Sequence, residues 1–287
     1  MSRVSEVLRY INICFFNGAF TRTTRISTSK EAKFHFTLTT TPDRLNKIKA
    51  TLLSLNDQTT PPSEIILNLP VMSMKGKQYV LPKYLMKIKN LRINRVPEDL
   101  GPGTKLIPTL HDDSIAANDF IVVVDDDQVY PKRLLETYLK NTRTFPGAAL
   151  TLCGWNVPPD MKHNRKKTKK GAGIKFKDPN PNVPEPLNVE ILQGASSFLV
   201  CKSFFTKDVF DYSDAPEGAL FADDIWFSGH LAKNNIPRKL IIGDFAFYRM
   251  HSFKHMGTTG LRYSVNADNQ NNNALYKYFE AHWKKFD

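Results

Sequence analysis

The stretch Ile121-Val122-Val123-Val124-Asp125-Asp126-Asp127 decides the fold of this 287-residue chain, because an apolar run ends there in three consecutive carboxylates. Four β-branched residues in a row predict a strand that is buried on both faces. The acidic triplet then emerges at the carboxyl end of the strand, where open α/β sheets bind their ligands. Three adjacent carboxylates repel one another unless a cation lies among them, and a hard divalent ion is the usual solution. Alternatively, one aspartate could cap a helix that begins near Pro131.

Strands and helices alternate in the first half of the chain. Runs of β-branched and aromatic residues predict strands at 34–40, 64–69, 91–96 and 120–124. Between them, apolar residues at helical spacing predict helices that begin at Leu45 and at Leu106. This alternation implies a parallel sheet with right-handed crossovers, so the expected fold class is α/β.

The second half of the chain is more irregular. The predicted elements are a strand at 197–201, a helix at 224–234, a strand at 239–242, an Asn-rich loop at 266–273 and a last helix at 275–283. No internal repeat is visible. The chain therefore reads as one large domain with short additions at both ends.

The composition is that of a soluble globular protein, with 41% hydrophobic and 24% charged residues. Cys14, Cys153 and Cys201 are widely spaced and form no CxxC pair, so we expect neither a disulfide framework nor a zinc site, and a reducing compartment fits. No window approaches ~20 consecutive apolar residues, so we expect a soluble, intracellular protein without a transmembrane segment.

The formal net charge of +12 is unevenly distributed. Eight Lys and Arg side chains lie between Lys162 and Lys177, with no acid among them. Such a segment is usually solvated, and the alternatives are a lid over phosphate groups or a contact with an anionic acceptor or a membrane surface. It lacks interleaved aromatic side chains, so we expect no nucleic-acid partner.

Two loops that follow predicted strands carry side chains suited to a nucleotide. The first offers hydroxyls, a carboxylate and a guanidinium, from Thr39, Thr41, Asp43 and Arg44. Threonine and aspartate also cap ordinary helices, so this signal is weak by itself. The second loop, Glu98–Lys105, places two acids, a Gly-rich turn and a lysine before a helix, so the turn can approach phosphates while the lysine neutralises them. Its spacing is not that of a P-loop.

Together with the acidic triplet, these loops resemble the GT-A fold glycosyltransferases, in particular the family 2-like group. The triplet is similar to the metal-binding DxD motif of that family, with Asp126 between Asp125 and Asp127. Gln193–Ser197 resembles the glycine loop that lines the donor sugar and the acceptor. Ala222-Asp223-Asp224 resembles the xED motif that holds the catalytic base, with Asp here in place of Glu.

The resemblance covers about residues 34–255 and implies a Rossmann-like GT-A fold, with a mostly parallel central sheet flanked by helices and an irregular acceptor-side half. It implies an N-terminal extension over 1–32 and a glycosyltransferase domain over 33–265. That domain would divide into a nucleotide-sugar half, 33–130, and an acceptor half, 131–265. A C-terminal tail helix would occupy 266–287.

The resemblance also implies the roles of individual residues. A Mn²⁺ or Mg²⁺ would be held by Asp125 and Asp127, with His251 as the C-terminal ligand and His255 as the alternative. Asp224 would be the general base, and Asp223 would orient it or bind the acceptor. The donor would be bound through Thr39, Thr41, Asp43, Arg44, Asp99, Lys105, Asp125, Asp126 and Gly194.

The implied activity is inverting transfer of a pentose or hexose from a nucleotide diphosphate sugar, with UDP as the expected nucleotide, to a glycan or glycoprotein hydroxyl. One alternative is a sugar nucleotidyltransferase, although residues 39–44 lack the glycine that such enzymes carry after the first strand. Another is a non-catalytic carbohydrate- or polyanion-binding protein, which would leave the triplet unexplained. The short architecture also resembles the soluble glycosyltransferases of large algal viruses, which implies a cytoplasmic protein, in the host cell if viral.

Overall fold

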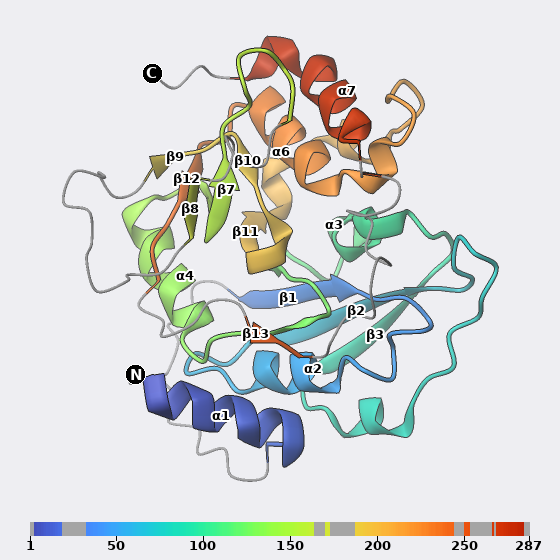
Figure 1. Cartoon of the computed structure of the whole chain (residues 1–287), viewed down its shortest axis with the longest axis vertical. Coiled ribbons are helices and arrows are strands. Elements are labelled where there is room, and N and C mark those ends of the chain that lie inside the picture. The colour runs from blue at the N-terminus through green and yellow to red at the C-terminus, as the bar shows by residue number, and fades with distance from the viewer. Residues whose placement is uncertain are drawn as a thin grey trace.

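The computed structural model describes residues 3–18, 33–163, 170–172, 187–243, 250–252, 266 and 268–283. They fold around a mixed eight-stranded sheet with the order β3-β2-β1-β4-β11-β6-β12-β9, and helices cover both of its faces (Figure 1). Four of the seven strand pairings in this sheet are parallel. The predicted α/β class, with a mostly parallel central sheet flanked by helices, is confirmed.

The described elements follow the chain in a regular alternation at first and less regularly later. The strands of the main sheet are β1 (Phe34–Thr39), β2 (Glu64–Pro70), β3 (Leu91–Val96), β4 (Phe120–Val123), β6 (Ala149–Thr151), β9 (Leu187–Asn188), β11 (Phe198–Cys201) and β12 (Arg238–Leu240). The α-helices are α1 (Arg3–Phe15), α2 (Lys49–Asn56), α3 (Ile107–His111), α4 (Leu134–Thr144), α6 (Asp223–Lys233) and α7 (Gln270–Tyr278). The 3₁₀ helices are η1 (Lys83–Lys87), η2 (Gly101–Lys105), η3 (Gly194–Ser196), η4 (Lys202–Phe204), η5 (Lys207–Phe210), η6 (Ala219–Phe221) and η8 (Glu280–His282).

The strand that precedes the acidic triplet, β4, lies in the interior of the sheet and is buried on both faces, as predicted. It pairs in parallel with β1 and antiparallel with β11. Ile121 and Val123 belong to the core on one side of the sheet, and Val122 and Val124 belong to the core on the other. Each fully buried side chain of this size stabilises the fold by about 1.5–3 kcal/mol, so β4 fixes the triplet firmly at the sheet rim.

Each face of the sheet has its own layer of helices (Figure 1). α2 and α4 pack on one face, where Leu52 and Tyr138 are fully buried. α3, α6 and α7 cover the other face, where Trp226 and Phe279 are among the largest buried side chains. The sheet therefore separates two hydrophobic cores, and the polar triplet lies where neither core continues.

Two smaller sheets complete the irregular half. One joins β10 (Ile191–Leu192), β7 (Cys153–Trp155) and β8 (Lys170–Ala172), and the other joins β13 (Met250–His251) and β5 (Gln128–Val129). β5 and β13 are antiparallel, with His251 opposite Gln128. This pairing brings a C-terminal segment against the residues that directly follow the triplet.

Two predicted boundaries are wrong. The helix expected from Leu45 begins at Lys49, because residues 42–48 form turns in which the amides of Arg44 and Leu45 both donate to the carbonyl of Thr41 at 3.0 Å. The Asn-rich loop expected at 266–273 ends early, because α7 begins at Gln270. Asn269 takes up a left-handed φ of 62° just before that helix, a conformation that asparagine tolerates better than most residues.

The N-terminal extension contains a helix, α1, that the sequence did not predict. Its buried side carries charge, since Glu6 and Arg9 are buried. Nε of Arg9 donates to Oδ2 of Asp57 at 2.8 Å, and Nη1 donates to the carbonyl of Tyr130 at 2.9 Å. In the described part of the chain, no helix has the length and apolar character needed to span a bilayer.

The contact between α6 and α7 requires a glycine. A Cβ at Gly229 would lie 2.2 Å from Cδ2 of Phe279, far inside contact distance. We expect Gly229→Ala to lower the free energy of unfolding by about 1–3 kcal/mol through overpacking, measured by urea denaturation. Helix propensity alone predicts that the variant gains about 1 kcal/mol in its free energy of unfolding. A variant more stable than the wild type would therefore contradict overpacking against Phe279. Lys140→Ala, at an exposed position of α4, is the control and should change stability by less than about 0.5 kcal/mol.

Candidate active site

A buried lysine joins carboxylates from two distant parts of the chain. Nζ of Lys105, at the end of η2, lies 2.6 Å from Oδ1 of Asp125 and 3.1 Å from Oδ2 of Asp223. Asp125 follows β4, and Asp223 begins α6. Burial alone would lower the pKa of Lys105, but the surrounding carboxylates raise it well above its usual value, so the ammonium stays charged. The ion pairs bring predicted donor-binding and catalytic residues into one cluster.

The sheet holds Lys105 in place through its backbone. The carbonyl of Lys105 accepts hydrogen bonds from the hydroxyl of Thr37 and, at 3.2 Å, from Nδ2 of Asn68. Asn68 also donates to the hydroxyls of Thr37 and Thr109, at 3.0 and 3.1 Å. All three polar side chains are fully buried. Because Thr37 lies on β1 and Asn68 on β2, the position of the lysine is set by two central strands.

Asp224, the predicted general base, lies beside the glycine loop. The amide of Gly194 donates to Oδ1 of Asp224 at 2.9 Å. A Cβ at Gly194 would lie 3.1 Å from that oxygen and 3.3 Å from Nζ of Lys105, so a larger residue would press on both groups. Glycine therefore allows the loop to approach the carboxylate closely.

The environment of Asp224 changes its protonation. Burial, and next the neighbouring carboxylate of Asp223, raise the pKa of Asp224 to about 8, although Lys105 and the Gly194 amide act in the opposite direction. A general base works best when its pKa lies near the working pH. The carboxylate of Asp224 can accordingly take up a proton near neutral pH, which an ordinary surface aspartate does not.

The middle carboxylate of the triplet is turned into the protein. Oδ1 of Asp126 lies 2.6 Å from Nη2 of Arg44, and Oδ2 accepts a hydrogen bond from the hydroxyl of Thr40 at 2.5 Å. Burial raises the pKa of Asp126 to about 6, although Arg44 and Thr40 lower it. The pair Arg44–Asp126 joins the loop after β1 to the loop after β4. In this state both side chains, which the sequence assigned to the donor, contact protein groups.

These cations change the charge argument for the triplet. From the sequence, repulsion among the three carboxylates predicted a divalent ion between them. Instead, Lys105 pairs with Asp125, and Arg44 contacts Asp126 and also Asp127, the latter at 3.4 Å. These two basic side chains offset part of the charge, but Lys105 is shared with Asp223, so the carboxylates around the triplet still outnumber the cations that contact them.

Asp127 and His251 come together beside β5. Nε2 of Gln128 donates to Oδ1 of Asp127 at 2.9 Å and lies 3.3 Å from Nδ1 of His251. The hydroxyl of Tyr10, in α1, donates to the carbonyl of His251 at 2.7 Å. One amide therefore bridges the two predicted metal ligands. His255, the alternative ligand, lies outside the described residues.

A complete protein cage for a metal is not present in the part of the chain that the structure describes. No group of three or more His, Cys, Asp or Glu side chains there is arranged to hold a metal ion. Magnesium-type ions at nucleotides commonly use one or two carboxylates together with phosphate oxygens. Asp127 offers one carboxylate of this kind and His251 lies beside it, so phosphate oxygens would have to supply further ligands.

The predicted nucleoside-binding residues lie at the sheet rim, where each has its own contacts. The hydroxyl of Thr39 donates to the carbonyl of Asn68 at 2.8 Å, while Thr41 is exposed. Asp43 is also exposed and pairs with Nζ of Lys77 at 2.9 Å. These residues are not part of the Lys105 cluster.

Asp99 is engaged in a similar way. Its carboxylate accepts hydrogen bonds from the amides of Met74 and Gly101, both at 2.9 Å. Met74 belongs to the same segment as Lys77, the partner of Asp43. The segment 71–78 is therefore tied to both carboxylates that the sequence assigned to the nucleoside.

No protein-family model and no curated protein matches the sequence. Among solved structures, the fold is similar to that in a crystal structure of TarS from S. aureus, with a TM-score of 0.45 and 18% sequence identity. The match covers 72% of this chain and 35% of the TarS chain, so this chain spans about a third of the length of that protein. The similarity concerns the path of the backbone.

One residue of the site, Gln128, and one backbone conformation, that of Ser197, were not predicted from the sequence. Gln128 bridges Asp127 and His251, and its position directly after the triplet is the only signal that could have found it. Ser197 ends the glycine loop with a φ of 87°, a conformation that costs about 1–3 kcal/mol for a residue other than glycine. Its hydroxyl lies 2.8 Å from that of Tyr138, but no sequence pattern announces this strained backbone.

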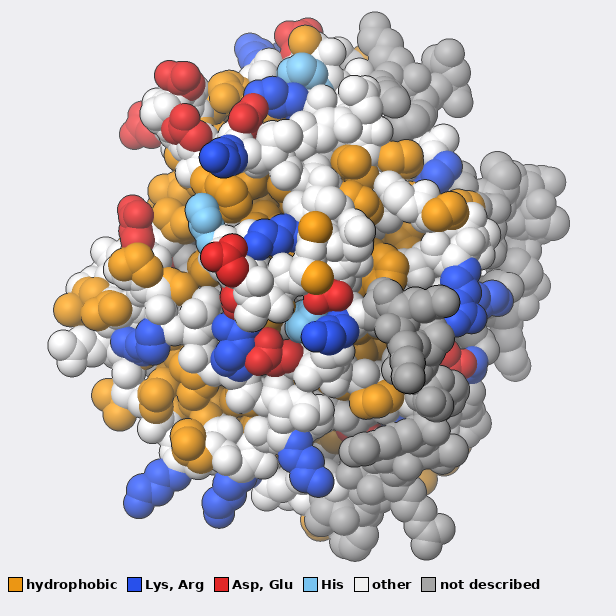
Figure 2. Space-filling model, turned by 180° about the vertical axis from the view of Figure 1, so that it is seen from behind, with side chains coloured by type: hydrophobic (Ala, Val, Ile, Leu, Met, Phe, Trp, Pro, Cys, Tyr) orange, Lys and Arg blue, Asp and Glu red, His pale blue; other side chains and the backbone are white. Residues whose placement is uncertain are grey.

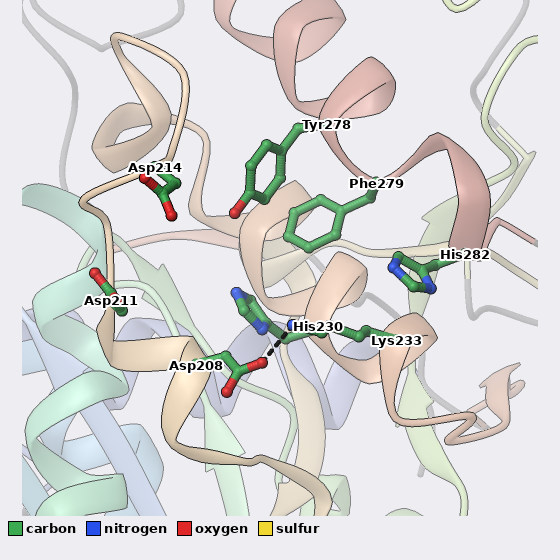
Figure 3. A pocket seen from close by; sticks show the side chains of 8 residues that line it. All are labelled: Asp208, Asp211, Asp214, His230, Lys233, Tyr278, Phe279 and His282. Carbon is green, nitrogen blue, oxygen red and sulfur yellow. Dashed lines mark hydrogen bonds and ion pairs between the residues drawn. The ribbon is translucent and has the colours of Figure 1, made fainter.

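A separate cavity of about 320 Å³ lies further along α6 (Figure 3). Its lining side chains are Asp208, Asp211, Asp214, His230, Lys233, Tyr278, Phe279 and His282. His230 is six residues after Asp224, which corresponds to about 9 Å along the helix. Burial lowers the pKa of His230 to about 4, so this imidazole is neutral at pH 7. None of the predicted site residues lines this cavity, and we place the candidate site at the Lys105 cluster, where buried charges converge.

Proposed function

We propose that this protein is a metal-dependent, inverting GT-A type glycosyltransferase that moves a sugar from a nucleotide diphosphate sugar to a hydroxyl of a glycan or glycoprotein. UDP is the proposed nucleotide. The observation that carries the proposal is the convergence of Lys105, Asp125, Asp224 and Gly194 at the carboxyl end of β4. Such a rim is where open α/β sheets bind their ligands.

Asp224 supplies the basic group of the proposed reaction. It accepts the proton of the acceptor hydroxyl as that oxygen forms a bond to the anomeric carbon of the donor sugar. In the same step the bond from that carbon to the diphosphate oxygen breaks, and its electron pair leaves with the nucleotide diphosphate. The amide of Gly194 keeps the carboxylate oriented through the 2.9 Å hydrogen bond. A single displacement of this kind inverts the anomeric centre.

The donor would be held by Lys105 and by the residues that follow β4. Lys105 carries a buried positive charge beside Asp125, where it can attract the diphosphate. Asp127 and His251 are the proposed ligands of a Mn²⁺ or Mg²⁺, with Gln128 orienting both. The ion would offset the charge that develops on the departing diphosphate.

Binding of the nucleoside requires the release of two carboxylates from contacts within the protein. Asp43 and Asp99 are the proposed partners of the base and ribose, and both are engaged by the segment 71–78. Donor binding would exchange these contacts for contacts with the nucleoside. The exposed pair Lys77–Asp43 is worth little energy, so release of Asp43 has a low cost.

A panel of UDP-, GDP- and dTDP-sugars, each with and without Mn²⁺, tests the proposal through the melting temperature of the protein. Binding to the folded state adds stability, about 2.7 kcal/mol at a ligand concentration a hundredfold above Kd. We expect one nucleotide class to raise the melting temperature only when Mn²⁺ is present. Asp127→Ala should remove this response.

Asp113→Ala is the matched control, because that carboxylate is fully exposed and outside the cluster. It should respond like the wild type. Stabilisation that persists without metal, or in Asp127→Ala, would contradict the metal role. Release of pyrophosphate from a nucleoside triphosphate and a sugar phosphate would favour a nucleotidyltransferase, and no response to any donor would favour a polyanion-binding protein.

A further inference from the structure

Helix α1 turns an apolar side to the surface. Val4, Leu8 and Phe15 are 68%, 61% and 73% exposed, and Val7, Ile11 and Phe16 are exposed as well. Positions 4, 8, 11 and 15 recur at helical spacing and form one apolar stripe. Contiguous exposed apolar patches usually mark a surface that binds a partner.

The opposite side of α1 fixes this orientation. Arg9 donates to Oδ2 of Asp57 at 2.8 Å and to the carbonyls of Tyr130 and Ser54 at 2.9 and 3.3 Å. Glu6 lies 3.5 Å from the same guanidinium. If the helix rotated to bury its stripe, the buried carboxylate of Asp57 would lose its closest cation and keep only Lys132, at 3.4 Å, and Arg9 would lose its three partners, which is unfavourable. The charged network therefore holds the stripe outward.

The same end of the molecule carries a second apolar segment that is also basic. α1 and the short helix η1 both lie at the lower end in Figure 1. Residues 71–89 contain five lysines and no acidic residue. Val80 and Met86 within this segment are each 83% exposed. Figure 2 shows hydrophobic and basic side chains intermingled at the lower left of the face seen from behind.

We propose that this end of the protein docks on an anionic membrane surface. A helix that lies in the membrane interface inserts its apolar side, while lysines nearby attract anionic headgroups. The α1 stripe supplies the first contact, and segment 71–89 supplies the second. The positive charge favours an anionic membrane over a second copy of the chain. Pairing two copies through this end would bring two sets of five lysines together. The proposal does not depend on the proposed glycosyl transfer.

Sedimentation of the full chain with vesicles tests this docking. One set of vesicles contains phosphatidylcholine alone, and the other also contains phosphatidylserine. We expect the protein to pellet with the anionic vesicles only, and less as the salt concentration rises. The double variant Leu8→Glu, Phe15→Glu should lower the membrane partition coefficient at least about tenfold, because it places two charges in the stripe.

Tyr278→Glu is the matched control, since Tyr278 is 42% exposed on α7 at the opposite end of the molecule (Figure 1). It should bind vesicles like the wild type. Phe15→Trp introduces a fluorescent side chain without changing the charge. The tryptophan fluorescence emission of this variant should move to shorter wavelength when anionic vesicles are added. Absence of pelleting with both vesicle types, or full binding by the double variant, would overturn the proposal. So would a concentration-dependent dimer that the double variant abolishes, because the stripe would then belong to a second copy.

Discussion

Asp224→Asn is expected to lower the rate of sugar transfer by about 10²–10⁴-fold while leaving donor affinity unchanged. The amide cannot accept the proton of the acceptor hydroxyl. Its oxygen can still receive the hydrogen bond from the Gly194 amide, so the glycine loop should keep its position. Turnover measured with a saturating donor, together with donor titration by calorimetry, separates the two effects.

The pH dependence provides a second readout of the same variant. The base must be ionised to act, and burial raises the pKa of Asp224 to about 8. For the wild type, kcat/KM should therefore rise with pH up to about that value and then level off. Asp224→Asn should lose this rise together with most of its activity.

Asp214→Asn is the control for Asp224→Asn, because Asp214 is an exposed carboxylate outside the cluster. It should keep wild-type turnover and the same pH profile. If Asp224→Asn weakened donor binding as much as turnover, Asp224 would be a donor ligand and not the base. A wild-type profile that levels off near pH 4 would contradict the raised pKa.

Lys105→Met is expected to lower the free energy of unfolding by about 3–5 kcal/mol, since it removes one partner of a buried ion pair. Asp125 and Asp223 would lose the cation that both contact. The pKa of Lys105 is raised by folding, so its contribution is fully present below the ordinary lysine pKa and is lost only as the pH rises through the higher folded value. Urea denaturation at pH 7 measures the full effect.

A matched control is Lys202→Met, because Lys202 also lies near a carboxylate, but that carboxylate, Asp113, is fully exposed and 3.8 Å away, and the other contact of Lys202 is a hydrogen bond to the carbonyl of Asp112 at 2.9 Å. This variant should lose less than about 1 kcal/mol. Combining Lys105→Met with Asp125→Asn should recover part of the loss, since one unpaired charge is removed. A loss below about 1 kcal/mol in Lys105→Met alone would show that the cluster does not stabilise the fold.

The sequence identified the parts of the fold where local pattern and burial agree. β4 is an uninterrupted apolar run, and its burial on both faces follows from that. α1 could not be found in this way, because its buried side carries Glu6 and Arg9 beside Ile13, while most of its apolar side chains face outward. Helical periodicity in a sequence predicts a helix whose apolar side is buried and whose charged side is exposed.

Only part of the candidate site could be predicted from the sequence. Motif order assigned Asp125, Asp224 and Gly194 to separate segments, and the structure brings them around Lys105. The roles of Arg44 and Asp126 depend on a contact between two loops, and the sequence contains no record of that contact. Side-chain pairing across loops is a property of the folded chain.

The order of strands in the main sheet has a consequence for synthesis of the protein. β4 ends at Val123, but its neighbour β11 begins at Phe198, some 75 residues later. A ribosome that adds about 5–20 residues per second needs about 4–15 s to make that length. During this interval one edge of an apolar strand has no partner, and such edges promote aggregation. The yield of folded protein should therefore depend on the rate of elongation and on chaperone supply more than on the stability of the finished fold.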